Sequence, residues 1–102
     1  MTDTRQEFAK RVATAAQAVP GVTRLSAQSP VRIRTPFPGG AVDGVRIEPD
    51  RVTVGVVIDR FPLIDVADAV REAVTTTVDT PGTAVRIIVV DVDLDRLPSA
   101  AG

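Results

Sequence analysis

The stretch GVRIEPDRVTVGVVID, residues 44–59, decides the fold of this chain. Apolar and polar side chains alternate over residues 44–48, and Val, Thr and Ile dominate residues 51–59, a composition typical of β-strands. Pro49-Asp50 lies between the two runs, where a tight turn joins antiparallel strands. The sequence therefore predicts a β-hairpin, against which the other elements pack.

Helical patterns lie on both sides of this hairpin. Thr4-Arg5-Gln6-Glu7 has capping-box spacing, and apolar residues then recur every three or four positions until Pro20-Gly21, so a helix is predicted to begin at Thr4. Pro62 suits the first turn of a second helix. The apolar stripe of that helix comprises Leu63, Val66, Ala67, Val70, Ala73, Val74 and Thr77 or Val78.

The remaining stretches predict further strands and a tail. Residues 22–27 give a weak strand signal, whereas Val31-Arg32-Ile33-Arg34-Thr35 alternates clearly. Residues 36–40 contain two prolines and two glycines, so a loop is expected there. Residues 84–92 are nearly all apolar, which predicts a strand buried on most of both faces. Residues 98–102 read as a frayed tail.

The chain is therefore expected to form one α+β domain. The predicted order is α-β-β-β-β-α-β, in two layers, with an antiparallel-rich sheet and two amphipathic helices. The domain should span residues 1–102, with an ordered core over about 4–95 and a flexible tail at 96–102.

Composition excludes many functions. The 12 basic and 13 acidic residues leave a net charge of -1, which disfavours non-specific binding to nucleic acid. Cys and His are absent, so disulfides, zinc sites of the usual ligands and a Cys or imidazole catalyst are excluded. No apolar run is long enough for a membrane helix and no signal peptide is evident, so we expect a soluble cytoplasmic protein that does not insert into the membrane.

Acidic residues are the remaining candidates for chemistry. Asp91, Asp93 and Asp95 alternate along a predicted strand end, but a calcium loop also needs a turn-forming Gly and a bidentate Glu. Asp59, Asp65 and Asp68 flank the junction between strand and helix, where turn and helix-dipole roles are the ordinary interpretation. We therefore expect no metal, no cofactor and no catalytic residue.

An interaction surface is the alternative to an active site. If the strands pair as predicted, some arginines and apolar residues alternate onto the sheet face that turns away from the core. Such an apolar strip rimmed by arginines could bind a protein or a second subunit. The opposing interpretation is that the first helix covers the strip. The candidate partner-binding residues are Arg32, Arg34, Arg46, Val57, Ile88 and Val90.

Three stretches carry a resemblance to a known family. They are RVATAAQAVPGVTRLSA at 11–27, GVRIEPDRVTVGVVIDRFPLIDVADAVREAV at 44–74 and AVRIIVVDVDL at 84–94. Together they cover most of the chain and resemble the alkaline shock protein family of envelope stress response proteins, in a small form like those of actinobacteria. The shared pattern is a helix ending in VPGV, then a strand, PL-x-x-VA and a helix.

The resemblance implies a non-enzymatic cytosolic protein that helps to maintain the cell envelope under stress. Some members are associated with the inner side of the membrane through a partner. No site residues carry over, because the family has no established catalytic set. The Lys-rich or acidic tails of longer members are absent here, which counts against a direct role at the membrane or in self-assembly.

Three functions remain open at this point. The leading hypothesis is an interaction or scaffold domain that presents a sheet face or edge to a partner, either a membrane-anchored protein or another copy of the chain. The second is a KH-like RNA-binding module, although the GxxG motif and aromatic stacking residues are missing. The third is a small carboxylate-dependent enzyme or assembly factor.

Overall fold

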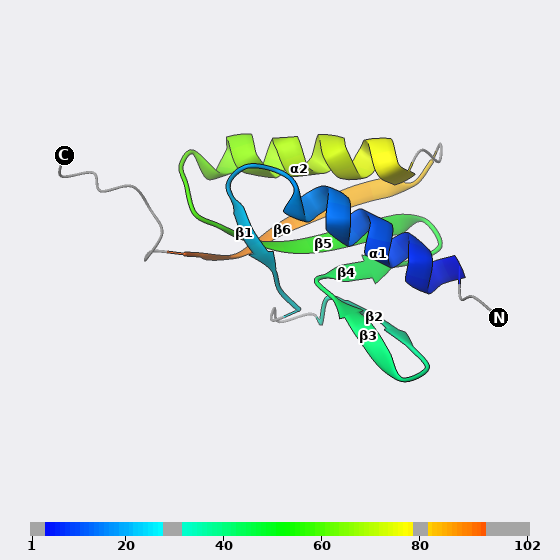
Figure 1. The fold of residues 1–102 in the computed structure, drawn as a ribbon. Helices are drawn as coiled ribbons and strands as arrows, with labels where there is room; N and C mark the ends of the chain where they lie inside the picture. Colours follow the sequence, from blue (N-terminus) through cyan, green and yellow to red (C-terminus); the bar gives the residue numbers. More distant parts are fainter. Residues whose placement is uncertain (1–3, 28–31, 79–81, 94–102) are drawn as a thin grey trace.

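The computed structural model of the chain describes residues 4–27, 32–78 and 82–93, and it confirms a mixed α+β fold (Figure 1). Two helices and six strands lie within these residues, one strand more than the sequence predicts. In chain order they are α1 (Thr4–Gln17), β1 (Val22–Leu25), β2 (Arg34–Phe37), β3 (Gly40–Asp43), β4 (Val45–Ile47), β5 (Arg51–Ile58), α2 (Leu63–Val78) and β6 (Ala84–Val92).

Strand β5 is the centre of the main sheet. β4 and β1 lie end to end along one of its edges, both antiparallel to it, with Val45 opposite Val54 and Leu25 opposite Val56. β6 runs parallel to β5 along the other edge, with Val54 opposite Ile87. The predicted hairpin of β4 and β5 is confirmed, and its turn is closed by a bond from the Glu48 amide to the Arg51 carbonyl oxygen at 2.8 Å.

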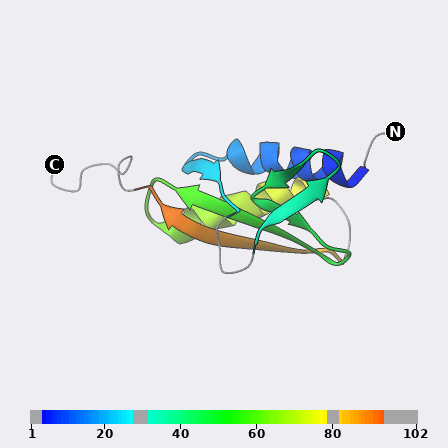
Figure 2. The same cartoon turned by 90° about the horizontal axis from the view of Figure 1, so that it is seen from below.

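Both helices cover the same face of this sheet. α1 lies against β1 and β4, α2 lies against β6, and the two helices contact each other. Figure 2, seen from below, has α2 behind the sheet. The core between the layers is built almost entirely from valine, as the low aromatic content requires. Its buried members are Ala9, Val12, Ala16, Val19, Val45, Val52, Val54, Val56, Ile58, Val66, Val70, Val74 and Val78.

The helix ends follow local sequence signals. α1 begins at Thr4 as predicted and gives way to a turn in which Gly21 has a φ of +101°, a left-handed conformation that glycine adopts without strain. α2 begins one residue after Pro62, whose peptide bond with Phe61 is cis. The Pro62 carbonyl oxygen accepts a bond from the Asp65 amide at 3.2 Å, and the predicted Val66, Val70, Val74 stripe is buried.

The prediction of a loop over residues 36–40 is wrong, because these residues lie in a β-hairpin. β2 and β3 make a separate two-stranded sheet joined by Pro38-Gly39, and Gly39 has the positive φ of +91° that such a tight turn requires. Pro36 is tolerated within β2 because a two-stranded sheet has only edges, where a missing N–H costs little. Compared with the strand predicted at 31–35, β2 begins three residues later and ends two residues later, and Val31 falls outside the described residues.

Gly55 marks the point where β1 and β4 meet along β5. Its amide donates to the Gly44 carbonyl oxygen at 2.9 Å, and its carbonyl oxygen accepts from the Ser26 amide at 3.0 Å. A Cβ at position 55 would lie 2.5 Å from the Ser26 oxygen and 2.8 Å from Ile33 Cδ1. The chain around Ser26 and Ile33 therefore crosses directly over the middle of β5, on the face opposite the helices.

Candidate functional site

The face of the sheet opposite the helices is here called the far face. The strand registers place on it the residues that alternate with the core valines. They are Arg24 of β1, Arg46 of β4, Thr53, Gly55 and Val57 of β5, and Arg86 and Ile88 of β6. Val90 reaches the same face, since its Cγ2 would lie 3.0 Å from a Cβ at Gly55.

The far face is only partly open, and this changes the predicted site. Val57 lies on the far face, yet it is 2% exposed, so the expectation that it lines an accessible apolar strip is corrected. The cover is not the first helix, as the opposing interpretation supposed. Ile33, itself 1% exposed, packs over Gly55 in the middle of this face. Ile88 and Val90 remain partly exposed toward the sheet margin.

The three predicted arginines do not form one cluster. Arg46 lies on the far face, where its Nε is 3.5 Å from Glu48 Oε1 and its Nη1 donates to the Arg32 carbonyl oxygen at 3.5 Å. Arg34 belongs instead to the β2–β3 hairpin, and its Nη2 lies 3.0 Å from Asp43 Oδ1. Arg32 and Arg34 are exposed and Ile33 and Thr35 are buried, so the predicted alternation is correct. The three arginines do not, however, rim one apolar strip as predicted.

Strand β6 supplies a feature that its sequence did not predict. No residue of β6 is fully buried, although the apolar run predicted burial on most of both faces. The physical reason is position: β6 pairs only with β5 among the described strands, and it runs along the margin of the sheet (Figure 2). An edge strand exposes one row of backbone N–H and C=O groups, which another strand can pair with.

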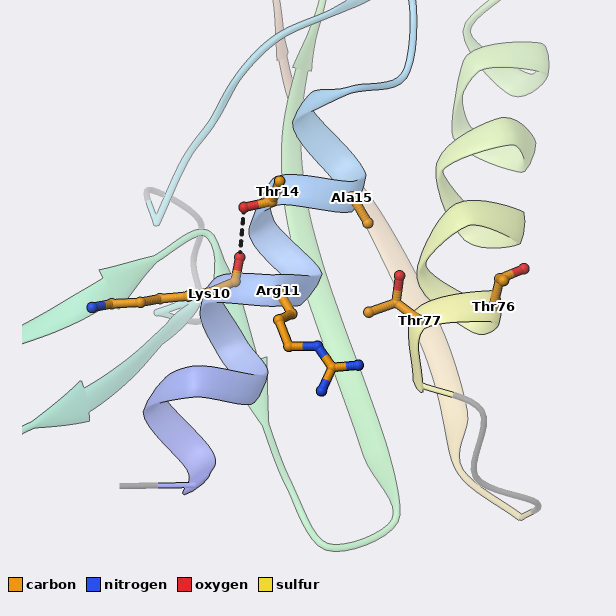
Figure 3. A pocket seen from close by; sticks show the side chains of 6 residues that line it. All are labelled: Lys10, Arg11, Thr14, Ala15, Thr76 and Thr77. Carbon is orange, nitrogen blue, oxygen red and sulfur yellow. Dashed lines mark hydrogen bonds between the residues drawn. The ribbon is translucent and has the colours of Figure 1, made fainter. Parts of the chain in front are cut away.

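A groove of about 560 Å³ lies between α1 and α2 (Figure 3). It is lined by Lys10, Arg11, Thr14, Ala15, Thr76 and Thr77. The three hydroxyl groups donate back to carbonyl oxygens of their own helices, Thr14 to Lys10 at 2.9 Å, Thr76 to Glu72 and Thr77 to Ala73, both at 3.0 Å.

The side chains of this groove do not form a catalytic arrangement. Figure 3 shows Lys10 directed away from α2 and Arg11 directed into the gap near Thr77. Lys10 Nζ lies 5.6 Å from the centre of the Phe37 ring, a cation–π contact that ties α1 to the hairpin. The three hydroxyls are bonded to helix backbone and the Lys10 amine lies over the Phe37 ring, so the gap between the helices presents the Arg11 guanidinium and no paired nucleophile and base.

The junction between β5 and α2 joins the two layers, as its sequence suggests. Asp59 Oδ1 accepts a bond from Arg60 Nε at 3.2 Å, and the Asp59 amide donates to the Gly21 carbonyl oxygen at 2.9 Å. Asp65 and Asp68 are exposed on α2 and do not converge with Asp59 in a shared hydrogen-bond network among the described residues. Phe61 and Ile64, each 64% exposed, are apolar surface residues that the sequence did not single out.

The described residues contain no group of three acidic, His or Cys side chains able to hold a metal ion. Asp91 is exposed and Asp93 is half-buried, while Asp95 falls outside the described residues, as does the predicted tail. Neither helix in the described part of the chain is both long and apolar enough to cross a membrane.

The fold and its surface together define a small α+β domain with one long apolar edge strand. Comparison of the chain with protein-family models, with curated proteins and with solved structures found no match.

Proposed function

We propose that this chain is a non-enzymatic interaction domain that binds a protein partner along β6. The observation that carries the proposal is the mismatch between sequence and position in this strand. Seven of the nine residues in AVRIIVVDV are apolar, a composition suited to the middle of a sheet, yet none of the nine is fully buried. A strand added at the free edge would bury both the apolar side chains and the backbone groups.

The chemistry of the edge defines the kind of partner. Ile87 and Val89 project on the helix side, while Ile88 and Val90 project on the far face, so a partner needs an extended segment with apolar residues on both of its faces. Arg86 and Asp91, both exposed, lie near the ends of this apolar run. A partner segment with one acidic and one basic residue at matching positions would complement them.

The resemblance to envelope stress response proteins supports a cellular setting for this function. On that basis the domain works in the bacterial cytoplasm in the maintenance of the cell envelope, and its partner at the inner face of the membrane is membrane-anchored or part of a scaffold. In this role the chain supplies a rigid docking platform rather than a reaction.

Site-specific photo-cross-linking tests the proposal. A benzophenone amino acid at Arg86 should yield covalent adducts with a protein partner, because this exposed residue lies on the far face of the edge strand. The matched control is the same group at Thr75, which is exposed on α2 in the helix layer. Equal adduct yields from the two positions, or adducts from Thr75 alone, would contradict docking at β6.

A further inference from the structure

We propose that the strand added at the β6 edge is β6 of a second copy of this chain, antiparallel and related by a two-fold axis at Ile88. This inference rests on the proposed function and names the partner for the same edge. An isologous pair of this kind joins two identical surfaces and closes after two copies.

The edge lacks most of the features that usually prevent such pairing. Natural edge strands are commonly protected by Pro, by inward-pointing charges or by being very short. The opposite edge of the sheet is protected by short strands, since β4 has three residues and β1 has four. β6 has nine residues, and its four central positions, 87–90, carry neither a charge nor a proline. Its one irregularity is a shift in register with β5 at Val90, at the end of this run, so residues 84–89 form a regular edge.

A two-fold axis at Ile88 matches the residues of β6 on both faces. In this register Ile88 meets Ile88 of the second copy on the far face, and Ile87 meets Val89 of the second copy on the helix side. All of these side chains are partly exposed in the single chain, and each gains an apolar neighbour across the pair.

Charge complementarity selects the second copy and its direction. The same register places Arg86 of one copy opposite Val90 and beside Asp91 of the other, and the symmetry repeats this ion pair. Arg86 and Asp91 both lie on the far face, at the positions paired with Thr53 and Val57. Parallel pairing in register would instead place Arg86 beside Arg86 and Asp91 beside Asp91.

Neither Arg86 nor Asp91 is ion-paired to a side chain in the described part of the chain. Asp91 Oδ1 accepts a bond from the Val92 amide at 2.8 Å, which leaves its second oxygen open to a cation. Arg86 and Asp91 are five residues apart on one strand, a separation of about 16 Å at about 3.3 Å per residue. They therefore cannot pair within one copy, so any coupling between them must arise between copies.

The pair would make one continuous sheet from two domains and place their far faces side by side. The absence of the tails found in longer family members counted against self-assembly. The dimer proposed here needs no tail, because its contact comes from β6. The four apolar central residues of each strand would pass from partial exposure to burial.

Sedimentation across a concentration series, extended to millimolar, tests this inference with three variants. Arg86→Asp and Asp91→Arg should each weaken dimerisation by about ten-fold or more, since each sets like charges together twice per dimer. The double variant, Arg86→Asp with Asp91→Arg, exchanges the two charges and should return the dissociation constant to within about three-fold of the parent. Thermal unfolding checks that all variants remain folded.

Arg24→Asp is the matched control, because Arg24 is also an exposed arginine of the far face but lies on β1, at the opposite side of β5. It should leave dimerisation unchanged. A parent chain that stays monomeric throughout, or a double variant no better than the single ones, overturns the dimer. If the cross-linker at Arg86 then still captures a different protein, the proposed function stands; if it captures none, both fall.

Discussion

Replacing Gly55 by alanine tests the crossing that closes the middle of the far face. The added Cβ would lie 2.5 Å from the Ser26 carbonyl oxygen, 2.8 Å from Ile33 Cδ1 and 3.0 Å from Val90 Cγ2. These contacts surround the new methyl group with the Ser26 backbone, the buried Ile33 side chain and the partly exposed Val90 side chain, so relief requires the crossing chain to move. Overpacking of this kind costs about 1 to 3 kcal/mol.

Movement of the crossing chain adds a second cost. The Ser26 amide donates to the Gly55 carbonyl oxygen at 3.0 Å, and the Ile33 carbonyl oxygen accepts from the Gly44 amide at 2.8 Å. Weakening these two bonds adds about 1 kcal/mol each. The expected loss in the free energy of unfolding is therefore about 3 to 5 kcal/mol, a large share of the roughly 5 to 15 kcal/mol that stabilises a domain.

Urea unfolding followed by circular dichroism measures this loss. Gly39→Ala is the control: position 39 has a φ of +91° but no atom within 4 Å of its Cβ position, so it carries backbone strain without a clash. It should cost about 1 kcal/mol. A loss at Gly55 no larger than the loss at Gly39 would refute the close crossing of Ser26 and Ile33 over β5.

Two further outcomes are expected. Val70→Ala removes two methyl groups from a side chain that is 0% exposed, and it should lower the free energy of unfolding by about 1.5 to 3 kcal/mol in the same urea assay. The control is Thr75→Ala on the exposed side of α2, which should change the free energy of unfolding by less than about 0.5 kcal/mol. Fluorescence anisotropy with labelled RNA should detect no submicromolar, salt-sensitive binding, because Arg34 and Arg46 are paired with Asp43 and Glu48 and the net charge is -1. Tight binding that weakens steeply with salt would instead favour an RNA-binding module.

The elements defined by neighbouring residues could be predicted from the sequence. The β4–β5 hairpin follows from two strand patterns separated by Pro49-Asp50, and its turn bonds form between residues three apart. The buried stripe of α2 follows from valines spaced four apart at 66, 70, 74 and 78. In both cases the signal and the structure lie within one short segment.

The features that depend on distant neighbours could not be predicted in this way. The apolar residues of β6 suit either a central strand or an exposed edge, and only the pairing of β6 with β5 alone distinguishes the two. Val57 alternates onto the far face as expected, but this face is covered in part by distant residues: Ile33, more than twenty residues earlier in the chain, packs over Gly55 beside it, and Val57 is 2% exposed. Residues 36–40 looked like a loop because a two-stranded sheet tolerates a proline that a larger sheet would exclude.

The order of strands along β5 has a consequence for synthesis of the chain. β1 and β4 both precede β5 in the sequence, so one edge of β5 can pair with them as soon as β5 leaves the ribosome. Its other edge must wait for β6, which follows the whole of α2. A nascent chain stalled after Val78 would therefore present the valines of β5 along an open edge, and this interval is when premature association or chaperone capture would occur.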